Sequence, residues 1–334
     1  MKTVLTLAVV HIALFTQAVQ KKATPPIGGQ THASLYVRSD TDKTTVISPR
    51  VRHRQQLGSP KRNLDITYSL DAWTSASIDI RTAATPTVSE LRHEVDAGYS
   101  HEIGLGAVHV GYRVSYEPDY LSNSVRISGQ REFLQRTITL QARLFGALDR
   151  VGRAGDSYFR ESVLSAGALL SSGFVLSRST LAVVAYELRG ISGYQASPYR
   201  YVALGGAGGC SIEAIFCVPE EVPRKRLRNA FVGQLRQALG RYVAVGGLYR
   251  FYIDSWLLYS HTGAVDLALT PIKSLQLGLE YRLYAQSGAE FYRASYIPFA
   301  GDRFVTRDRE LSSLGNHRLA LSGRYRHPLR RGSL

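Results

Sequence analysis

Arginines at alternate positions are the residues of this chain best suited to chemistry. Arg50, Arg52 and Arg54 form one ladder at a spacing of two, and a second ladder runs over 318–326. Guanidinium groups that line a low-dielectric tube attract anions and concentrate them. The predicted basic wall comprises Arg50, Arg52, Arg54, Arg113, Arg126, Arg143, Arg282, Arg318, Arg324 and Arg326, and the predicted acidic set comprises Asp65, Asp71, Glu94, Asp96 and Glu280.

Two uses of such a charged interior remain open. In a pore, the arginine wall and the carboxylates set up a field across the lumen that favours anionic or zwitterionic solutes. In a plugged barrel, the same groups pair as salt bridges and nothing passes. We expect a pore or a transport or export channel, with a plugged structural or binding barrel as the alternative.

Catalytic chemistry finds less support in the sequence. His261 follows Ser260, and Asp254 and Asp302 fall in connecting segments, but neither a Ser-His-Asp spacing nor a nucleophile elbow is present. The histidines do not form a metal motif on a helix. We therefore expect that the protein is not an enzyme, and we predict no catalytic residue, metal or cofactor.

The elements that would hold the charged side chains are amphipathic strands. In residues 274–286, SLQLGLEYRLYAQ, the odd positions from Leu275 to Leu283 are apolar or aromatic and the even positions are mostly polar. Successive side chains of a strand point to opposite faces, so this stretch has one apolar and one polar face. Its apolar face is about ten residues long, which matches a tilted strand that crosses a bilayer.

The same alternation recurs along most of the chain, in about fourteen segments of the kind found in outer-membrane barrels. The predicted strands are 33–38, 44–57, 64–75, 92–102, 108–116, 124–131, 135–149, 159–172, 175–188, 226–239, 241–251, 257–269, 274–286 and 317–326. Short turns alternate with longer connections at 81–91, 150–158, 189–225 and 287–311. The pattern predicts an all-β, transmembrane, antiparallel up-and-down barrel of about 14 strands (about 12–16), with both termini on the periplasmic side.

A soluble β-sandwich or lipocalin-like barrel would show the same period. Charged residues on nearly every polar face, a steady strand length and a high strand count favour the membrane barrel. Tyrosines on the apolar face near strand ends, such as Tyr112, Tyr249 and Tyr281, suit an interfacial girdle. Closing the barrel requires the first and last strands to pair, which would bring the two arginine ladders together on one inner wall.

The N-terminal end has the features of a secretory signal peptide. Lys2 precedes an apolar stretch, and Thr16-Gln17-Ala18 offers small residues at the cleavage positions, with cleavage expected after Ala18. We expect a signal peptide at 1–18, a flexible periplasmic lead-in at 19–32 and the barrel at 33–334, located in the outer membrane of a Gram-negative bacterium. After export, Cys210 and Cys217 are expected to form a disulfide.

The two longest loops are the other predicted functional surface. Both are rich in Tyr, Arg and Gly, and they either fold inward as a constriction, remain solvated, or bind lipopolysaccharide phosphates through Arg303, Arg307 and Arg309. The expected partners are outer-membrane lipid and lipopolysaccharide, the barrel assembly machinery and a small anionic solute. The net charge of +15 does not indicate nucleic-acid binding, because the basic residues are spread over strands of an exported chain.

Several stretches resemble the bacterial outer-membrane family catalogued as domain of unknown function 3570. They are TTVISPRVRHRQQLG (44–58), DAWTSASIDIRTAATPTVSELRHEVDA (71–97), YRVSYEPDYLS (112–122), DRVGRAGD (149–156), GYQASPYRYVALGG (193–206), YRFYIDSWLLYSHT (249–262) and YRLYAQSGAEFYRASY (281–296). The resemblance covers roughly residues 30–330 and implies a Gram-negative outer-membrane β-barrel without an assigned active site. It also suggests a periplasmic redox partner, through which a plugged barrel would act. Unlike many barrels, the chain does not end in an aromatic residue.

Overall fold

The computed structural model describes residues 28–39, 45–74, 89–205, 210, 216–298 and 301–326. The predicted signal peptide lies outside the described residues, as does the predicted lead-in up to residue 27. The lead-in was expected to reach residue 32, but the first strand already begins at Gly29.

Fourteen strands form one sheet, and two short strands form another. The strands of the large sheet are β1 Gly29–Ser39, β2 Thr45–Gln56, β3 Arg62–Thr74, β4 Ser89–Ile103, β5 Gly106–Glu117, β6 Tyr120–Phe133, β7 Ile138–Arg153, β8 Asp156–Val175, β9 Thr180–Gly193, β12 Lys225–Leu239, β13 Val243–Asp254, β14 Tyr259–Ile272, β15 Leu275–Gln286 and β16 Leu314–Tyr325. The small sheet pairs β10 Tyr201–Ala203 with β11 Cys217–Pro219, and a 3-10 turn, η1, covers Arg309–Leu311.

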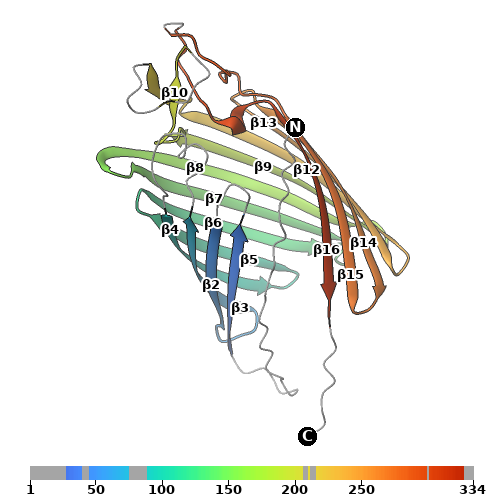
Figure 1. Cartoon of the computed structure of the whole chain (residues 1–334). Helices are drawn as coiled ribbons and strands as arrows, with labels where there is room; N and C mark the ends of the chain where they lie inside the picture. The colour runs from blue at the N-terminus through green and yellow to red at the C-terminus, as the bar shows by residue number, and fades with distance from the viewer. Residues whose placement is uncertain are drawn as a thin grey trace.

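Every strand of the large sheet pairs with its neighbour in chain order, and every pairing is antiparallel. Figure 1 shows the strands as a steeply curved, tilted wall. The all-β, up-and-down fold and the number of strands are therefore confirmed. Since the strands alternate in direction and are even in number, β1 begins and β16 ends at the same end of the sheet.

We call this the turn end, because the connections there are short, and we call the opposite end the cap end. The described residues of 194–224 and 287–313 form the cap (Figure 1). The chain leaves β9 for the cap at Gly193, whose φ is +124° and whose position leaves no room for a Cβ, which would lie 2.1 Å from the Ser162 carbonyl oxygen. Only glycine fits this exit without strain.

The first and last strands do not pair among the described residues, contrary to expectation. The sheet order ends at β1 on one side and at β16 on the other, so the Arg50–Arg54 and Arg318–Arg326 ladders are not on neighbouring strands. An open strand edge satisfies its backbone groups only where water reaches them, so this seam has to be closed or covered in a bilayer.

The outer face of the sheet carries exposed apolar side chains on every strand from β1 to β16 of the large sheet. Leu321 is 80% exposed, Val265 60% and Leu144 60%, and comparable side chains follow on most of the other strands. A soluble monomer rarely shows so large a continuous apolar surface, whereas lipid tails cover one at no cost. The outward direction of these rows is the one expected of a transmembrane barrel.

Strand bounds differ from the sequence-based expectation mainly at one hairpin. The predicted loop 150–158 is largely strand: β7 runs to Arg153 and β8 begins at Asp156, with Gly155 at a φ of +79° in the turn. This hairpin extends beyond the apolar band, the part of the outer face that contacts lipid tails. Alternation of apolar and polar residues is not required there, so the stretch is polar.

Candidate functional site

The predicted charged residues and the residues that line the lumen near the cap lie on the same face of the sheet, the inner face. Residues directly opposite each other on neighbouring strands share a face. The row runs Arg54, Asp65, Gly98, Gly111, Arg126, Phe145, Gly167, Arg189, Arg228 and Asp254. The glycines in this row let long side chains lie flat: a Cβ on Gly111 would be 2.6 Å from the Arg126 guanidinium.

On β2 to β6 the inner charges pair with one another. Arg52 and Arg54 both reach Asp65, at 2.6 and 3.0 Å. Arg126 makes two bonds to Asp96, of 2.6 and 2.5 Å. Two further ion pairs join Arg92 to Asp71 and Arg113 to Glu94.

On β15 and β16 the inner charges lack such partners. Arg282 lies directly opposite Arg318, and Glu280 lies opposite Asp266, which itself binds Arg236 at 2.6 Å. Within the described ranges, no ion pair involves Arg143, Arg282, Arg318, Arg324, Arg326 or Glu280. The sequence predicted the type of these residues correctly but not their division into a paired and an unpaired region. Their roles in selectivity stay predictions.

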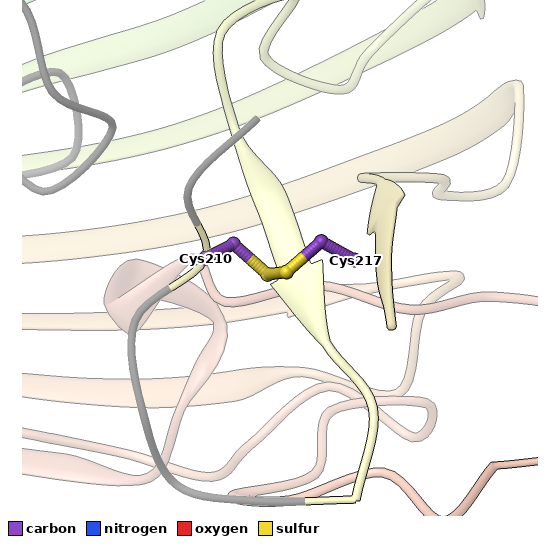
Figure 2. The surroundings of a disulfide bond; sticks show 2 residues. All are labelled: Cys210 and Cys217. Carbon is purple, nitrogen blue, oxygen red and sulfur yellow. A yellow bond between two sulfur atoms is a disulfide. The ribbon is translucent and has the colours of Figure 1, made fainter. Parts of the chain in front are cut away.

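The cap is a folded unit that joins the two longest connections. Glu221 pairs with Val305 in an antiparallel bridge, and Leu204 pairs with Tyr296 in a parallel one. Val202, which is 1% exposed, packs in a buried cluster with Tyr296 and Val305. Cys210 and Cys217 form the predicted disulfide, drawn in Figure 2. Since the loops pack on each other, they are neither separate nor fully solvated.

Buried charges hold the two halves of the cap together. Glu220, whose side chain is 1% exposed, accepts two hydrogen bonds from Arg200, at 3.0 and 2.9 Å, and a third from the hydroxyl of Thr306. Arg200 also contacts Asp308 at 3.2 Å. Tyr296 donates to carbonyl oxygens and accepts from two backbone N–H groups of the second loop, and burial raises the pKa of its hydroxyl.

A cavity of about 710 Å³ lies between the cap and the inner wall. Tyr194 and Asp308 line it from the cap, while Asp149, Arg228 and Tyr252 line it from the strands. The loops therefore reach the wall of the lumen. Sequence reasoning proposed an inward constriction as one possibility, but it did not predict a cavity or its lining, because the contacts join residues far apart in the chain.

A buried ion pair anchors the cap side of this cavity. Asp254, with no exposed side-chain surface, accepts from Arg226 Nε at 2.8 Å and from the Tyr252 hydroxyl at 2.7 Å. It also accepts from the backbone N–H of Trp256, and the Arg226 guanidinium lies 4.0 Å from the centre of the Trp256 ring. Asp254, a residue considered for catalysis, is thus fully occupied in positioning the β13–β14 connection.

The serine and histidine considered for catalysis do not act together. Ser260 is buried on the inner face, whereas His261 lies on the outer face and binds the Tyr249 hydroxyl at 2.7 Å. Consecutive strand residues necessarily point apart. Asp302 lines a separate cavity inside the cap. The expectation that the protein is not an enzyme stays a prediction.

A ring of tyrosine pairs on the outer face escaped sequence analysis. Each tyrosine lies six residues after the start of its strand. Its hydroxyl forms a hydrogen bond with a His or Asn on the next strand of the sheet. That His or Asn lies two residues closer to the cap end than the residue directly opposite the tyrosine. The pairs are Tyr68–His93, Tyr112–Asn123, Tyr186–Asn229, Tyr249–His261 and Tyr281–His317. The sequence-predicted girdle tyrosines Tyr112, Tyr249 and Tyr281 belong to this ring, which satisfies polar groups that face lipid.

The described part of the chain contains no group of three or more His, Cys, Asp or Glu side chains placed to hold a metal ion. Within the same ranges, no helix is long and apolar enough to cross a membrane. The absence of a metal and a cofactor from the function stays an expectation.

Residues 165–325 match the model of a family described as "Protein of unknown function (DUF3570)". The matched stretch, just under half of the chain, is therefore similar to this family. The match confirms the resemblance over residues 165–325, which include β9, β12 to β16 and the cap, while the resembling stretches before residue 165 lie outside it. The family's description names no activity. No curated protein matches the chain.

Two solved structures are similar in fold. One is the ferric-catecholate import receptor Fiu from E. coli K12, in its open form, with 8% identity and a TM-score of 0.48 over 78% of this chain and 55% of the receptor. The other is OmpT, an outer membrane protein of Vibrio cholerae, with 9% identity and a TM-score of 0.43 over 91% of both chains. This chain therefore spans little more than half of the receptor.

Proposed function

We propose that this protein is an outer-membrane β-barrel of a Gram-negative bacterium that conducts small anionic or zwitterionic solutes. The apolar outer face and the even, up-and-down strand order support the location. The charged inner face supports a polar lumen.

The main support for a pore is the pair of neighbouring arginines Arg282 and Arg318. The two residues are direct register partners on the inner face, and Arg324 follows on the same face of β16. Like charges directly opposite each other destabilise a sheet, so structure alone gives little reason for this arrangement. In a narrow polar lumen, the same arrangement produces a positive potential that attracts anions.

A plugged binding barrel is the second candidate, and the cap favours it. Two long loops fold together, bury charged residues and reach the inner wall above the unpaired arginines. The cap then acts either as a constriction through which solutes pass or as a lid on a binding cavity. Lipopolysaccharide and a periplasmic redox partner remain proposals for what such a barrel would contact.

Planar-bilayer recordings of the purified, refolded protein in a potassium chloride gradient test the pore. We expect discrete conductance steps and a reversal potential whose sign shows preference for chloride over potassium. Bilayers that contain the protein but never conduct would contradict the pore and favour the plugged barrel. Conductance with a preference for potassium would contradict the role of the arginine wall.

A further inference from the structure

The cavity beneath the cap has charges of opposite sign on its two sides. Arg189 on β9 and Arg228 on β12 are direct register partners, and both line the cavity together with Arg250 on β13. Across the cavity stand Asp149 on β7 and Asp119 in the β5–β6 turn. The strands therefore place the arginines and these two carboxylates at different parts of one open cavity, to whose lining the cap adds Asp308 and Glu310.

The three arginines keep unused donors. Within the described residues, none of them forms an ion pair, whereas their neighbour Arg226 is neutralised by Asp254. Arg189 binds only the Ser165 hydroxyl, at 3.2 Å, and its guanidinium lies near the Phe145 ring. The Nε atoms of Arg189 and Arg228 are buried without a protein acceptor. Because these Nε atoms have almost no accessible surface, an anionic group in the cavity would bind the terminal guanidinium nitrogens of the two arginines.

The carboxylates on the other side are held in place by hydroxyl groups. The Tyr120 hydroxyl donates to Asp149 Oδ2 at 2.8 Å, and the Ser122 hydroxyl donates to Oδ1 at 2.6 Å. The Tyr199 hydroxyl from the cap donates to Asp119. Hydroxyl donors fix a carboxylate without neutralising it, so these groups still attract a cation.

We propose that this cavity binds a small zwitterion, with its carboxylate at Arg189 and Arg228 and its ammonium group at Asp149. The class includes short peptides with free termini. A cavity of about 710 Å³ falls in the range of small-molecule sites. Asp149 lies two strands from Arg189 and four residues nearer the cap end than the register row of Arg189, so their Cα atoms are roughly 16 Å apart. The long arginine side chain shortens the gap that a chain of about three residues has to span. The inference deepens the proposed function and rests on it, since it names the solute of the same lumen.

Calorimetric titration of the full-length protein in detergent tests the inference with three probes. These are trialanine, N-acetyl-trialanine, which lacks the ammonium group, and trialanine amide, which lacks the carboxylate. We expect trialanine to bind at least about ten-fold more tightly than either blocked form, because each blocked form leaves one side of the cavity unmatched. Equal binding of the three, binding of N-acetyl-trialanine as tight as that of trialanine, or no binding would overturn the proposal.

Two variants locate the site. Arg228→Gln is expected to reduce trialanine binding and to leave binding of the amide unchanged, and Asp149→Asn is expected to reduce trialanine binding and to leave that of the acetylated peptide unchanged. Arg136→Gln, in an exposed turn at the turn end, is the matched control and should bind like the unchanged protein. If Arg228→Gln and Asp149→Asn both fold and bind trialanine normally, the site is wrong.

Bilayer recordings on the same preparation separate this inference from the proposed pore. Conductance without any trialanine binding would overturn the zwitterion site and leave the pore standing. Trialanine binding by a protein that does not conduct would overturn the pore and leave the site standing.

Discussion

Two regions of the same inner wall use arginine in opposite ways. On β2 to β6, the register places carboxylates within reach of arginines, as in Asp65 beside Arg52 and Arg54. On β15 and β16, the register places Arg282 opposite Arg318. Both regions are rich in arginine, but the carboxylates Asp65, Asp71, Glu94 and Asp96 lie on β3 and β4, whereas β15 and β16 contribute Glu280 alone.

The comparison shows that the number of arginines on a wall does not by itself determine the electrostatic potential of the lumen beside it. A paired guanidinium contributes little field beyond its own carboxylate, whereas an unpaired one acts over roughly a Debye length, about 8 Å at physiological salt. The β15–β16 wall therefore dominates the predicted selectivity, although the β2–β6 wall holds several arginines. The cap stands over the cavity above the same side of the sheet.

Removing the unpaired arginines should have the largest effect on selectivity. Arg282→Gln combined with Arg318→Gln is expected to lower the chloride-to-potassium permeability ratio by at least about two-fold, because it removes charge that nothing compensates. The reversal potential in a salt gradient measures this.

A matched pair of substitutions in the other region provides the control. Arg126→Gln combined with Asp96→Asn removes a complete ion pair, so the permeability ratio should stay close to that of the unchanged protein. Equal changes in the two double variants would show that the distinction between the two regions is wrong.

Converting the paired region into an unpaired one is the next largest change. Asp65→Asn leaves Arg52 and Arg54 without their carboxylate, so anion preference should rise, by less than about two-fold. Thermal unfolding should also shift down, because two guanidinium groups then repel each other. A fall in anion preference would contradict this explanation.

The cap should respond to alkaline pH on its own. Burial raises the pKa of Tyr296 above its usual value of 10.0. The folded cap then prefers the neutral hydroxyl, so its stability is fully present below pH 10 and declines as the pH rises through the higher folded pKa. Proteolysis of the cap loops at pH 8 and pH 11 measures this, and Tyr296→Phe should remove the pH dependence. Equal protection of the unchanged protein at both pH values would contradict it.

The outer face should give the smallest effect. Tyr249→Phe removes one hydrogen bond to His261 and is expected to cost about 1 kcal/mol of unfolding free energy. Selectivity should not change, because Tyr249 points away from the lumen. A changed reversal potential in this variant would show that the assignment of faces is wrong.

Much of the fold could be predicted from sequence because the period of two is a local property. The stretch SLQLGLEYRLYAQ determines which residues of β15 face each way, and neighbouring stretches repeat the pattern. The weak alternation in 150–158 misled the prediction, since this hairpin leaves the apolar band.

The site could be predicted only in part, because pairing depends on register. The sequence shows that Arg282 and Arg318 point inward, but not that they stand face to face. The glutamate at 220 gave no signal, since its partners Arg200 and Thr306 come from different parts of the chain. The closing pair of β1 and β16 was expected from membrane physics and is absent from the sheet order.

Single cysteines at neighbouring positions of β15 test the central claim most directly. The native cysteines are bound in a disulfide, so only an added thiol reacts. In reconstituted vesicles, Arg282→Cys should react with a charged, water-soluble methanethiosulfonate reagent, whereas Tyr281→Cys should be protected from it and reached by a lipid-soluble maleimide. The opposite ranking, or equal reaction of both with the charged reagent, would contradict a charged face that lines a watery interior and an apolar face in lipid.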